Sequence, residues 1–198
     1  MNIGIIGSGR IGGTVGTLWA RAGHTVLFGS RHPEHLGALI AEAGNGARAG
    51  TIAEAAAFGA AVLFAPPFDA TDEVLSAVGA RSGALDGKIL IDATNPYQQD
   101  LSGLALPTTT TAAEELQRTV PRARLVKAYN TLPAAVLADD AHRPAGQQYV
   151  LFYSGAEAAA KTVVAGLIAR TAGLPRSTRA RSPTRTTRSR AAPSTASG

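Results

Sequence analysis

A glycine-rich turn close to the amino terminus is the feature that most constrains how this chain folds. The apolar run Asn2–Ile6 leads into Gly7-Ser8-Gly9-Arg10-Ile11-Gly12, and Ile11–Ala22 then has the composition of a helix. A strand, a turn with this glycine spacing and a helix together favour a dinucleotide-binding unit. In such a turn Gly7 permits the sharp bend, Gly9 lets the backbone approach a diphosphate, and Gly12 allows close helix–strand packing. The alternative is a turn whose glycines serve compactness alone.

The residues after the second expected strand indicate which dinucleotide is bound. His24–Phe28 is expected to be that strand, and Gly29-Ser30-Arg31-His32 follows it. Proteins that prefer NAD place a carboxylate here for the ribose hydroxyls, whereas a hydroxyl and a guanidinium can bind a ribose phosphate. Arg31 can also stack on the adenine, and Arg10 beside the turn is a second candidate cation. We therefore predict NADP(H) as the cofactor. The alternative is that Ser30 and Arg31 merely begin a loop.

Strands and helices alternate along the rest of residues 1–175. This alternation predicts one α/β domain of Rossmann type, with a doubly wound, mostly parallel sheet covered by helices on both faces. Residues 97–109 are expected to form a polar loop, and Thr111 to cap a helix whose first turn holds Glu114-Glu115. The remaining expected strands are Ala47–Thr51, Ala61–Ala65, Lys88–Ile91, Leu125–Ala128 and Tyr149–Tyr153, and the remaining expected helices are Pro33–Ala43, one ending at Phe58, Ala70–Val78, Thr111–Arg118 and Ala156–Ala172.

The carboxyl-terminal residues 176–198 have a different composition from the rest of the chain. The net charge of +5 arises there, because residues 1–175 hold 13 basic and 14 acidic residues while the tail holds six arginines. The tail has almost no apolar side chain larger than alanine, so we predict a disordered basic segment. One interpretation is an arm that binds nucleic acid. The other is a shifted reading frame, because suitable codons for 176–184, read from the third base, encode Val-Asp-Ala-Gly-Pro-Leu-Ala-Asp-Ala.

Composition excludes several classes of site and partner. The chain has no cysteine, which excludes disulfides, cysteine-ligated metals and thiol catalysis. The amino terminus lacks the basic region of a signal peptide, and no apolar stretch approaches the roughly 20 residues of a membrane helix. We therefore expect a cytoplasmic protein without a membrane partner, and no nucleic-acid partner for residues 1–175.

Other polar residues have ordinary interpretations. His32 and His35 are expected on a solvated face without a metal, and Asp139-Asp140 with His142 in a polar loop rather than an acid–base pair. Trp19 is expected to pack in the core. Asp92 either forms a turn or faces a ligand, because it ends a strand at the edge where ligands bind.

Several sequence motifs carry a resemblance that extends over about residues 1–175. The chain resembles the NADPH-dependent coenzyme F-420 (deazaflavin) reductase family and related NADP-dependent dinucleotide-binding oxidoreductases, and the cytosolic domain of the six-transmembrane metalloreductases is similar but more distant. The motifs occur together and in order: Gly7–Gly12, Gly29-Ser30-Arg31, Ala65-Pro66-Pro67, Asp92-Ala93-Thr94-Asn95-Pro96 and Lys127-Ala128-Tyr129-Asn130-Thr131-Leu132-Pro133.

The resemblance implies a role for each motif. Ser30 and Arg31 would hold the 2′-phosphate, Ala65-Pro66-Pro67 would pass beneath the nicotinamide ribose, and Asn95 with the 129–135 turn, Asn130 included, would line a hydride-transfer cleft. The implied reaction is direct hydride transfer between NADPH and a flavin or deazaflavin. The two cofactors carry this chemistry, while the protein aligns them and excludes water. No catalytic acid, base, nucleophile or metal is implied.

Two departures from the family bear on the acceptor. Asn130 stands where the deazaflavin reductases carry a histidine, so the acceptor is left open between a deazaflavin and a flavin. The shifted tail would resemble the terminal strand of the family, which helps to cover the acceptor site and to build a homodimer. A chain without it would bind NADPH and reduce its acceptor poorly or not at all.

Two other functions stay open at this point. One is a reductase of small imines or carbonyls, although such enzymes append a large helical domain that is not evident here. The other is a non-catalytic NADPH-binding module.

Overall fold

The computed structural model describes residues 1–170 apart from 45, 99, 141–142, 144–146 and 148. At its centre is a six-stranded sheet in the order β3-β2-β1-β4-β5-β6, in which every neighbouring pair is parallel. The predicted α/β fold with a doubly wound parallel sheet is confirmed, while the tail predicted over 176–198 lies outside the described residues. The strands are β1 (Asn2–Ile6), β2 (Thr25–Ser30), β3 (Arg48–Thr51), β4 (Ala61–Phe64), β5 (Ile89–Asp92) and β6 (Arg124–Lys127).

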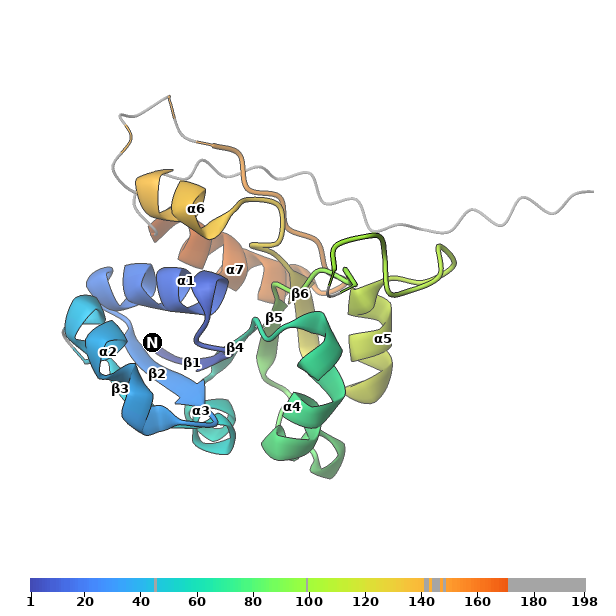
Figure 1. Cartoon of the computed structure of the whole chain (residues 1–198), viewed down its shortest axis with the longest axis horizontal. Helices are drawn as coiled ribbons and strands as arrows, with labels where there is room; N and C mark the ends of the chain where they lie inside the picture. Colours follow the sequence, from blue (N-terminus) through green and yellow to red (C-terminus); the bar gives the residue numbers. More distant parts are fainter. Residues whose placement is uncertain (45, 99, 141–142, 144–146, 148, 171–198) are drawn as a thin grey trace, which may run out of the picture.

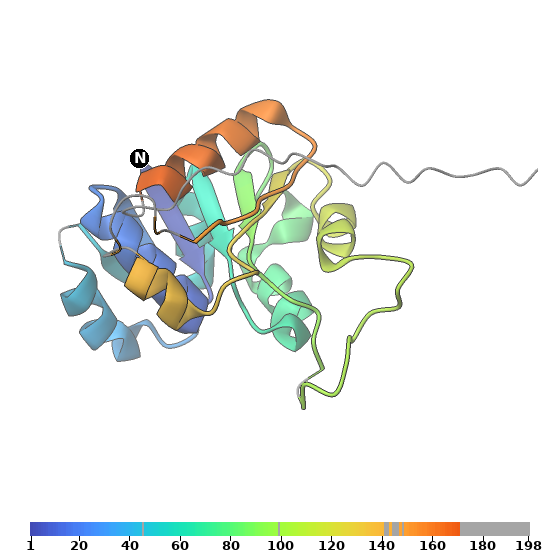
Figure 2. The ribbon, with the colours of Figure 1, turned by 90° about the horizontal axis from the view of Figure 1, so that it is seen from above.

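Helices cover both faces of the sheet (Figures 1 and 2). One face carries α1 (Arg10–Arg21), α6 (Ala134–Asp140) and α7 (Ala158–Arg170), and the other carries α3 (Ile52–Phe58), α4 (Thr71–Val78) and α5 (Ala112–Thr119). Helix α2 (Gly37–Ala43) lies beside α1 and β3. Short 3₁₀ helices precede α2 at Pro33–Leu36, precede α4 at Phe68–Ala70 and follow it at Ala80–Ser82.

The side chains of the central strands divide between two apolar layers. On β4, Ala61 and Leu63 pack with α1, α6 and α7, whereas Val62 and Phe64 pack with α3, α4 and α5. Successive residues of a strand point to opposite faces of a sheet. A strand buried on both faces must therefore be apolar throughout, which is why β4 reads as the uninterrupted run Ala-Val-Leu-Phe.

Most predicted elements are present, and two predictions are wrong. The helical segment expected over Pro33–Ala43 is present as a 3₁₀ turn that continues into α2. Asp139-Asp140 belong to α6 and not to a loop, because Leu137 one turn earlier is fully buried in the layer formed with α1. The run Tyr149–Tyr153 does not form a strand of the sheet; directly after it, Ser154 forms an isolated antiparallel bridge with Lys127 of β6.

Two local predictions are confirmed by side-chain contacts. The hydroxyl of Thr111 accepts the backbone N–H of Glu114 at 3.2 Å, and the Glu114 carboxylate accepts the N–H of Thr111 at 2.8 Å, a reciprocal capping box at the start of α5. Trp19 is fully buried and meets the Tyr129 ring edge to face, with the centroids 5.6 Å apart. The capping box fixes where α5 begins, and the aromatic pair fixes how α1 packs against the turn at Tyr129.

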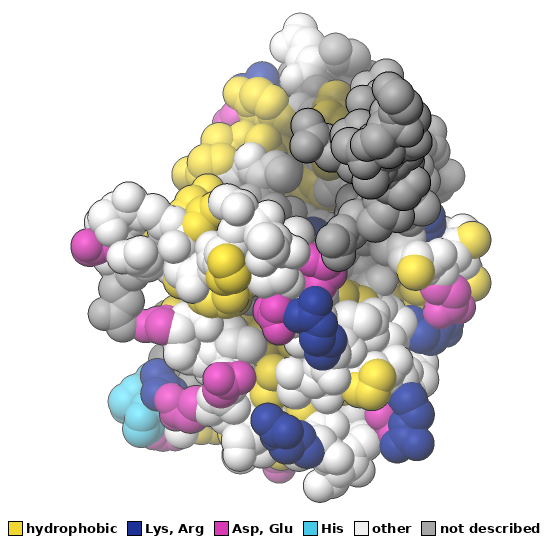
Figure 3. Space-filling model, turned by 90° about the vertical axis from the view of Figure 1, so that its right-hand side faces the viewer, with side chains coloured by type: hydrophobic (Ala, Val, Ile, Leu, Met, Phe, Trp, Pro, Cys, Tyr) yellow, Lys and Arg dark blue, Asp and Glu magenta, His cyan; other side chains and the backbone are white. Residues whose placement is uncertain are grey.

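The helices of the described residues and one face of the molecule bear on the expectations for a membrane span and for charge. None of the helices in that part of the chain has both the length and the apolar character needed to cross a bilayer. On the face seen in Figure 3, basic and acidic side chains are interspersed.

The packing of α1 against the sheet depends on a glycine and generates a first prediction. A Cβ at Gly16 would lie 2.4 Å from Cε1 of the buried Phe28 ring and 3.1 Å from Cγ1 of Ile5. Gly16→Ala is expected to lower the free energy of unfolding by roughly 1–3 kcal/mol, because an overpacked core must shift side chains or backbone. Urea denaturation followed by circular dichroism measures the change.

The matched control is Gly166→Ala in α7, where a Cβ would meet no atom within 4 Å. It should raise the unfolding free energy by roughly 0.5–1 kcal/mol through helix propensity. Equal effects of the two substitutions would contradict the packing argument.

Candidate functional site

The loops that carry the predicted site residues lie at one edge of the sheet. Gly7 follows β1, Arg31 follows β2, Ala65 follows β4, Asn95 follows β5 and Asn130 follows β6. Because all six strands are parallel, their carboxyl ends share this edge. The strand order reverses direction at β1 and β4, and ligands of open α/β sheets bind in the crevice outside such a switch point.

The glycine turn has the geometry that a dinucleotide diphosphate requires. Gly7 has φ +91°, and a Cβ there would lie 2.6 Å from the carbonyl carbon and oxygen of Ala65; a Cβ on Gly12 would lie 2.0 Å from the Gly7 oxygen. Gly9 differs, because nothing lies within 4 Å of the place its Cβ would occupy. Gly7 and Gly12 are therefore in close contact with neighbouring backbone, whereas Gly9 leaves open space directly before α1. The amino terminus of a helix attracts anions.

The turn after β2 is connected to the glycine turn and carries the predicted phosphate ligands. The hydroxyl of Ser8 donates to the Gly29 carbonyl at 3.0 Å, and the hydroxyl of Ser30 accepts the backbone N–H of His32 at 3.0 Å. Arg31 is exposed and lies 3.3 Å from the carboxylate of Glu73 on α4. Arg10 is also exposed, at the start of α1. Both guanidiniums are accessible to a ligand at this edge.

His32, Glu34 and His35 form an exposed cluster beyond Arg31. Their potential ligand atoms lie within 4.8 Å of one another, and the two imidazoles stack with centroids 5.3 Å apart. The backbone amide of Glu34 and then the two histidines lower the pKa of the Glu34 carboxyl. Exposure of all three side chains agrees with the solvated face predicted for the histidines, and the absence of a metal role for them stays a prediction.

The segment after β4 forms the floor beside the glycine turn. Ala65 donates its backbone N–H to the Ile6 carbonyl at 2.8 Å, which continues the pairing of β4 with β1 beyond the last strand residue. Pro66 is buried and Pro67 exposed. Proline has no backbone N–H, so this segment ends the sheet pairing and passes close beneath Gly7.

Asn95 and Asn130 face each other across the ends of β5 and β6. The side-chain amide of Asn95 donates to the Asn130 backbone carbonyl at 2.8 Å, and the amide of Asn130 donates to Oδ1 of Asn95 at 3.2 Å. Tyr129, fully buried, has φ +62°, an uncommon backbone conformation for a residue other than glycine. Such conformations concentrate at functional sites. Here the bend immediately precedes the amide that pairs with Asn95.

A cavity of about 320 Å³ joins this amide pair to the glycine turn. Ile11 of the turn and Ala93 line it together with Asn95 and the residues that follow β6. Two sequence motifs more than 80 positions apart thus border one space, as the implied hydride-transfer cleft requires.

A buried ion pair braces the loop that carries Asn95. The Lys127 ammonium lies 2.9 Å from Oδ2 of Asp92, whose side chain is wholly buried, and it also donates to the Thr94 carbonyl. Oδ1 of Asp92 accepts the Thr94 backbone N–H at 2.9 Å and its hydroxyl at 2.7 Å. Of the two roles open for Asp92, turn formation is the one these contacts support.

The sequence interpretation missed two of the residues that organise this edge. Lys127 belongs to the Lys127–Pro133 motif, but its ammonium pairs with Asp92, 35 positions earlier in the chain. Glu73 lies 42 positions from Arg31 and carries no local signal at all. Only the strand order, which brings β2 and α4 to the same edge, could have indicated that contact.

The fold and this edge are those of a dinucleotide-binding protein, and similarity to known proteins identifies the class as the NADP-dependent oxidoreductases. Residues 2–96 match the family model described as NADP oxidoreductase coenzyme F420-dependent. A solved structure from Arthrobacter sp. FB24, assigned as an F420-dependent NADP-reductase, is 32% identical, with 86% of this chain and 81% of that chain covered and a TM-score of 0.76. The chain therefore belongs to the family of coenzyme F-420-dependent NADP oxidoreductases.

Two further relatives show how far the similarity extends. The structure of hypothetical protein SMa0349 from Sinorhizobium meliloti is 30% identical, covers 88% of this chain and 83% of that chain, and has a TM-score of 0.77. Metalloreductase STEAP3 of Rattus norvegicus is 30% identical over 135 residues. That alignment covers 68% of this chain, and the chain spans 25% of the length of that relative.

The buried ion pair generates a second prediction. Lys127→Met leaves the wholly buried Asp92 carboxylate without its cation, so the free energy of unfolding should fall by about 3–5 kcal/mol. Adding Asp92→Asn should restore part of the loss, because the remaining charge is removed. Chemical denaturation of the single and double variants measures both steps.

Lys161→Met on α7 is the control and should change the unfolding free energy by less than about 0.5 kcal/mol. A Lys127→Met protein as stable as the parent would show that the pair does not brace the loop.

Proposed function

We propose that this protein transfers hydride between NADP(H) and a flavin or a deazaflavin of the coenzyme F-420 type. The observation that carries the proposal is the cavity in which Ile11 of the glycine turn meets Asn95 and Asn130. When bound, NADPH supplies the hydride. Its oxidation to NADP⁺ reduces the acceptor by two electrons, and the acceptor takes one proton from solvent.

The residues of the edge have separate tasks in this proposal. The backbone amides of Gly7–Gly12 and the amino terminus of α1 bind the diphosphate, for which Gly9 leaves the space. Ser30 and Arg31 bind the 2′-phosphate, with Arg10 as a further cation near the diphosphate. Ala65-Pro66-Pro67 support the nicotinamide ribose. Asn95 and Asn130 orient the reacting rings and occupy space that water would otherwise fill.

The side chains that line the cavity support the proposed class of acceptor. Among the described residues, no cluster of acid, base and nucleophile lines it; the polar side chains of its lining are the two paired asparagines, Thr131 and Tyr129. Direct hydride transfer between two ring systems needs alignment more than proton-transfer groups. Stopped-flow oxidation of NADPH with coenzyme F-420, flavin mononucleotide and small imines tests the class. NADPH binding without turnover of any acceptor would favour the binding module or a carboxyl-terminally impaired enzyme.

The proposed role of Arg31 gives a third prediction. Arg31→Ala should weaken NADPH binding by roughly 1–3 kcal/mol, the size of a hydrogen bond to a charged group, and should leave NADH binding unchanged. Isothermal titration calorimetry with both cofactors measures the difference. Arg81→Ala, at an exposed position in the 3₁₀ turn after α4, is the matched control. Equal losses for NADPH and NADH would refute the 2′-phosphate role.

The ion pair of Arg31 with Glu73 gives a fourth prediction. The Glu73 carboxylate competes with a phosphate for the same guanidinium and repels the phosphate as well. Glu73→Gln should therefore tighten NADPH binding by roughly 0.2–1 kcal/mol, the range for an exposed pair, without affecting NADH. Glu42→Gln, which loses a similar exposed pair with Arg21, should change neither affinity. Weaker NADPH binding by Glu73→Gln would mean that Glu73 instead holds Arg31 in its binding position.

A further inference from the structure

Among the described residues, one group of three side chains brings potential metal-ligand atoms close together. It consists of His32, Glu34 and His35, and none of them lines the cavity at Asn95 and Asn130. All three are exposed, and Figure 3 shows histidine side chains in cyan beside acidic and basic ones. From the sequence we expected no metal at the two histidines. The structure places a carboxylate close to both imidazoles, which supplies a third ligand.

A single turn of 3₁₀ helix sets the spacing of the cluster. Pro33 begins the turn, and the backbone N–H of His35 donates to the His32 carbonyl at 3.1 Å. Because a 3₁₀ helix has three residues per turn, side chains three positions apart lie above one another. The imidazoles of His32 and His35 accordingly stack, with their centroids 5.3 Å apart. The backbone thus holds the two rings together without an ion.

The distances between the ligand atoms are close to those around a tetrahedral ion. Oε1 of Glu34 lies 3.2 Å from Nδ1 of His32 and 3.9 Å from Nε2 of His35, and the potential ligand atoms of the cluster lie within 4.8 Å of one another. Zinc bonds of about 2.0–2.2 Å at tetrahedral angles separate neighbouring ligand atoms by about 3.3–3.6 Å. Small rotations of three exposed side chains suffice to reach these separations. Two imidazoles and one carboxylate also form a recurrent zinc-ligand set, in which water takes the fourth position.

The cluster adjoins the residues that we propose for the 2′-phosphate. Arg31 directly precedes His32, and the backbone N–H of His32 donates to the hydroxyl of Ser30 at 3.0 Å. An ion on the His32 imidazole would add two positive charges beside Arg31 and restrain the residue that holds Ser30. Since opposite charges attract, the ion and a bound phosphate would favour each other.

We propose that His32, Glu34 and His35 bind a divalent transition-metal ion of the zinc class, and that this ion strengthens NADPH binding at Ser30 and Arg31. The first part goes beyond the proposed function, and the second part rests on it. Imidazole nitrogens favour Zn²⁺ and similar ions, whereas Mg²⁺ prefers oxygen ligands. Because the cluster lies outside the lining of the cavity at the asparagine pair, the ion acts on cofactor affinity and not on the transferred hydride.

Metal binding is tested with zinc chloride alone, without a nucleotide. Isothermal titration calorimetry of the full chain, carrying no histidine tag, should show one Zn²⁺ per chain, and magnesium chloride should give no binding. Glu34→Gln and His35→Gln should each weaken Zn²⁺ binding by at least about tenfold, since even the loss of a residue behind a ligand typically costs that much. Equal Zn²⁺ affinities of the parent and both variants would overturn the site.

Two matched controls keep the same kinds of substitution away from the cluster. His142→Gln removes a histidine that lies more than 100 positions later in the sequence, and Glu42→Gln removes an exposed carboxylate of α2. Both should bind Zn²⁺ as tightly as the parent. A tenfold loss in His142→Gln would place the ion elsewhere and contradict the assignment.

The effect on the cofactor is tested by titrating NADPH and NADH with saturating Zn²⁺ and, separately, with EDTA. Zn²⁺ should tighten NADPH binding by about two- to fivefold, the range for interactions between exposed charges, and leave NADH unchanged. NADPH should tighten Zn²⁺ binding by the same factor, because coupling between two sites is reciprocal. His35→Gln should lose the coupling and, in EDTA, bind NADPH like the parent, which shows that the variant is folded.

The outcomes distinguish this inference from the proposed function. If Zn²⁺ binds at the cluster but tightens NADPH and NADH equally, the ion does not act through the 2′-phosphate, and the second part fails. If the parent binds NADPH no more tightly than NADH in EDTA, the proposed role of Ser30 and Arg31 fails, while the zinc site is judged by its own titration. Absence of Zn²⁺ binding with an intact preference for NADPH would refute the inference and leave the proposed function standing.

Discussion

The close approach of the glycine turn to β4 is the constraint on which the rest of the site depends. A Cβ at Gly7 would overlap the Ala65 carbonyl, and a Cβ at Gly12 would overlap the Gly7 oxygen. Without side chains at these two positions, α1 can start directly at the end of β1, with its amino terminus beside the switch point of the sheet. The helix terminus, the open space at Gly9 and the floor formed by Pro66 are consequences of this one contact.

The half of the site at the ends of β5 and β6 depends on electrostatics rather than on close backbone packing. Asp92 ends a strand that is buried on both faces, so its carboxylate needs a partner, and Lys127 on the neighbouring strand supplies one. The same carboxylate shapes the turn through Thr94, and that turn presents Asn95 to Asn130. An ion pair that is neutral overall thus organises a polar loop without giving the adjoining cavity a net charge.

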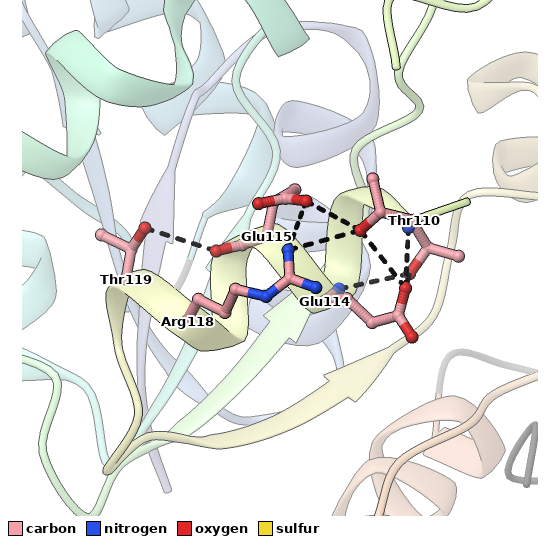
Figure 4. Close-up of polar contacts among 6 residues, drawn as sticks. Thr110, Glu114, Glu115, Arg118 and Thr119 are labelled. Carbon is pink, nitrogen blue, oxygen red and sulfur yellow. Dashed lines mark hydrogen bonds and ion pairs between the residues drawn. The ribbon is translucent and has the colours of Figure 1, made fainter. Parts of the chain in front are cut away.

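The sequence predicted those features that arise from local patterns. Hydrophobic periodicity, glycines and capping residues predicted the elements from Asn2–Ile6 to the helix capped by Thr111 (Figure 4) to within a few residues. The failures have one common cause, which is contact between distant segments. The run Tyr149–Tyr153 has the composition of a strand, yet the chain approaches β6 next to Gly155, where a Cβ would lie 2.7 Å from the Leu125 oxygen. The pairing of Glu73 with Arg31 likewise has no local signal.

Charge is distributed unevenly along the edge of the sheet that carries the candidate site. At one end, cations without buried partners face outward, and Arg31 is opposed only by an exposed carboxylate that a phosphate can displace. At the other end, Lys127 is already neutralised by the buried Asp92. Among the described residues of this edge, a doubly charged phosphate therefore finds its accessible guanidiniums at the end formed by β2. In the proposed function, this asymmetry of charge favours the 2′-phosphate at the end formed by β2 and leaves the reacting rings beside the paired asparagines.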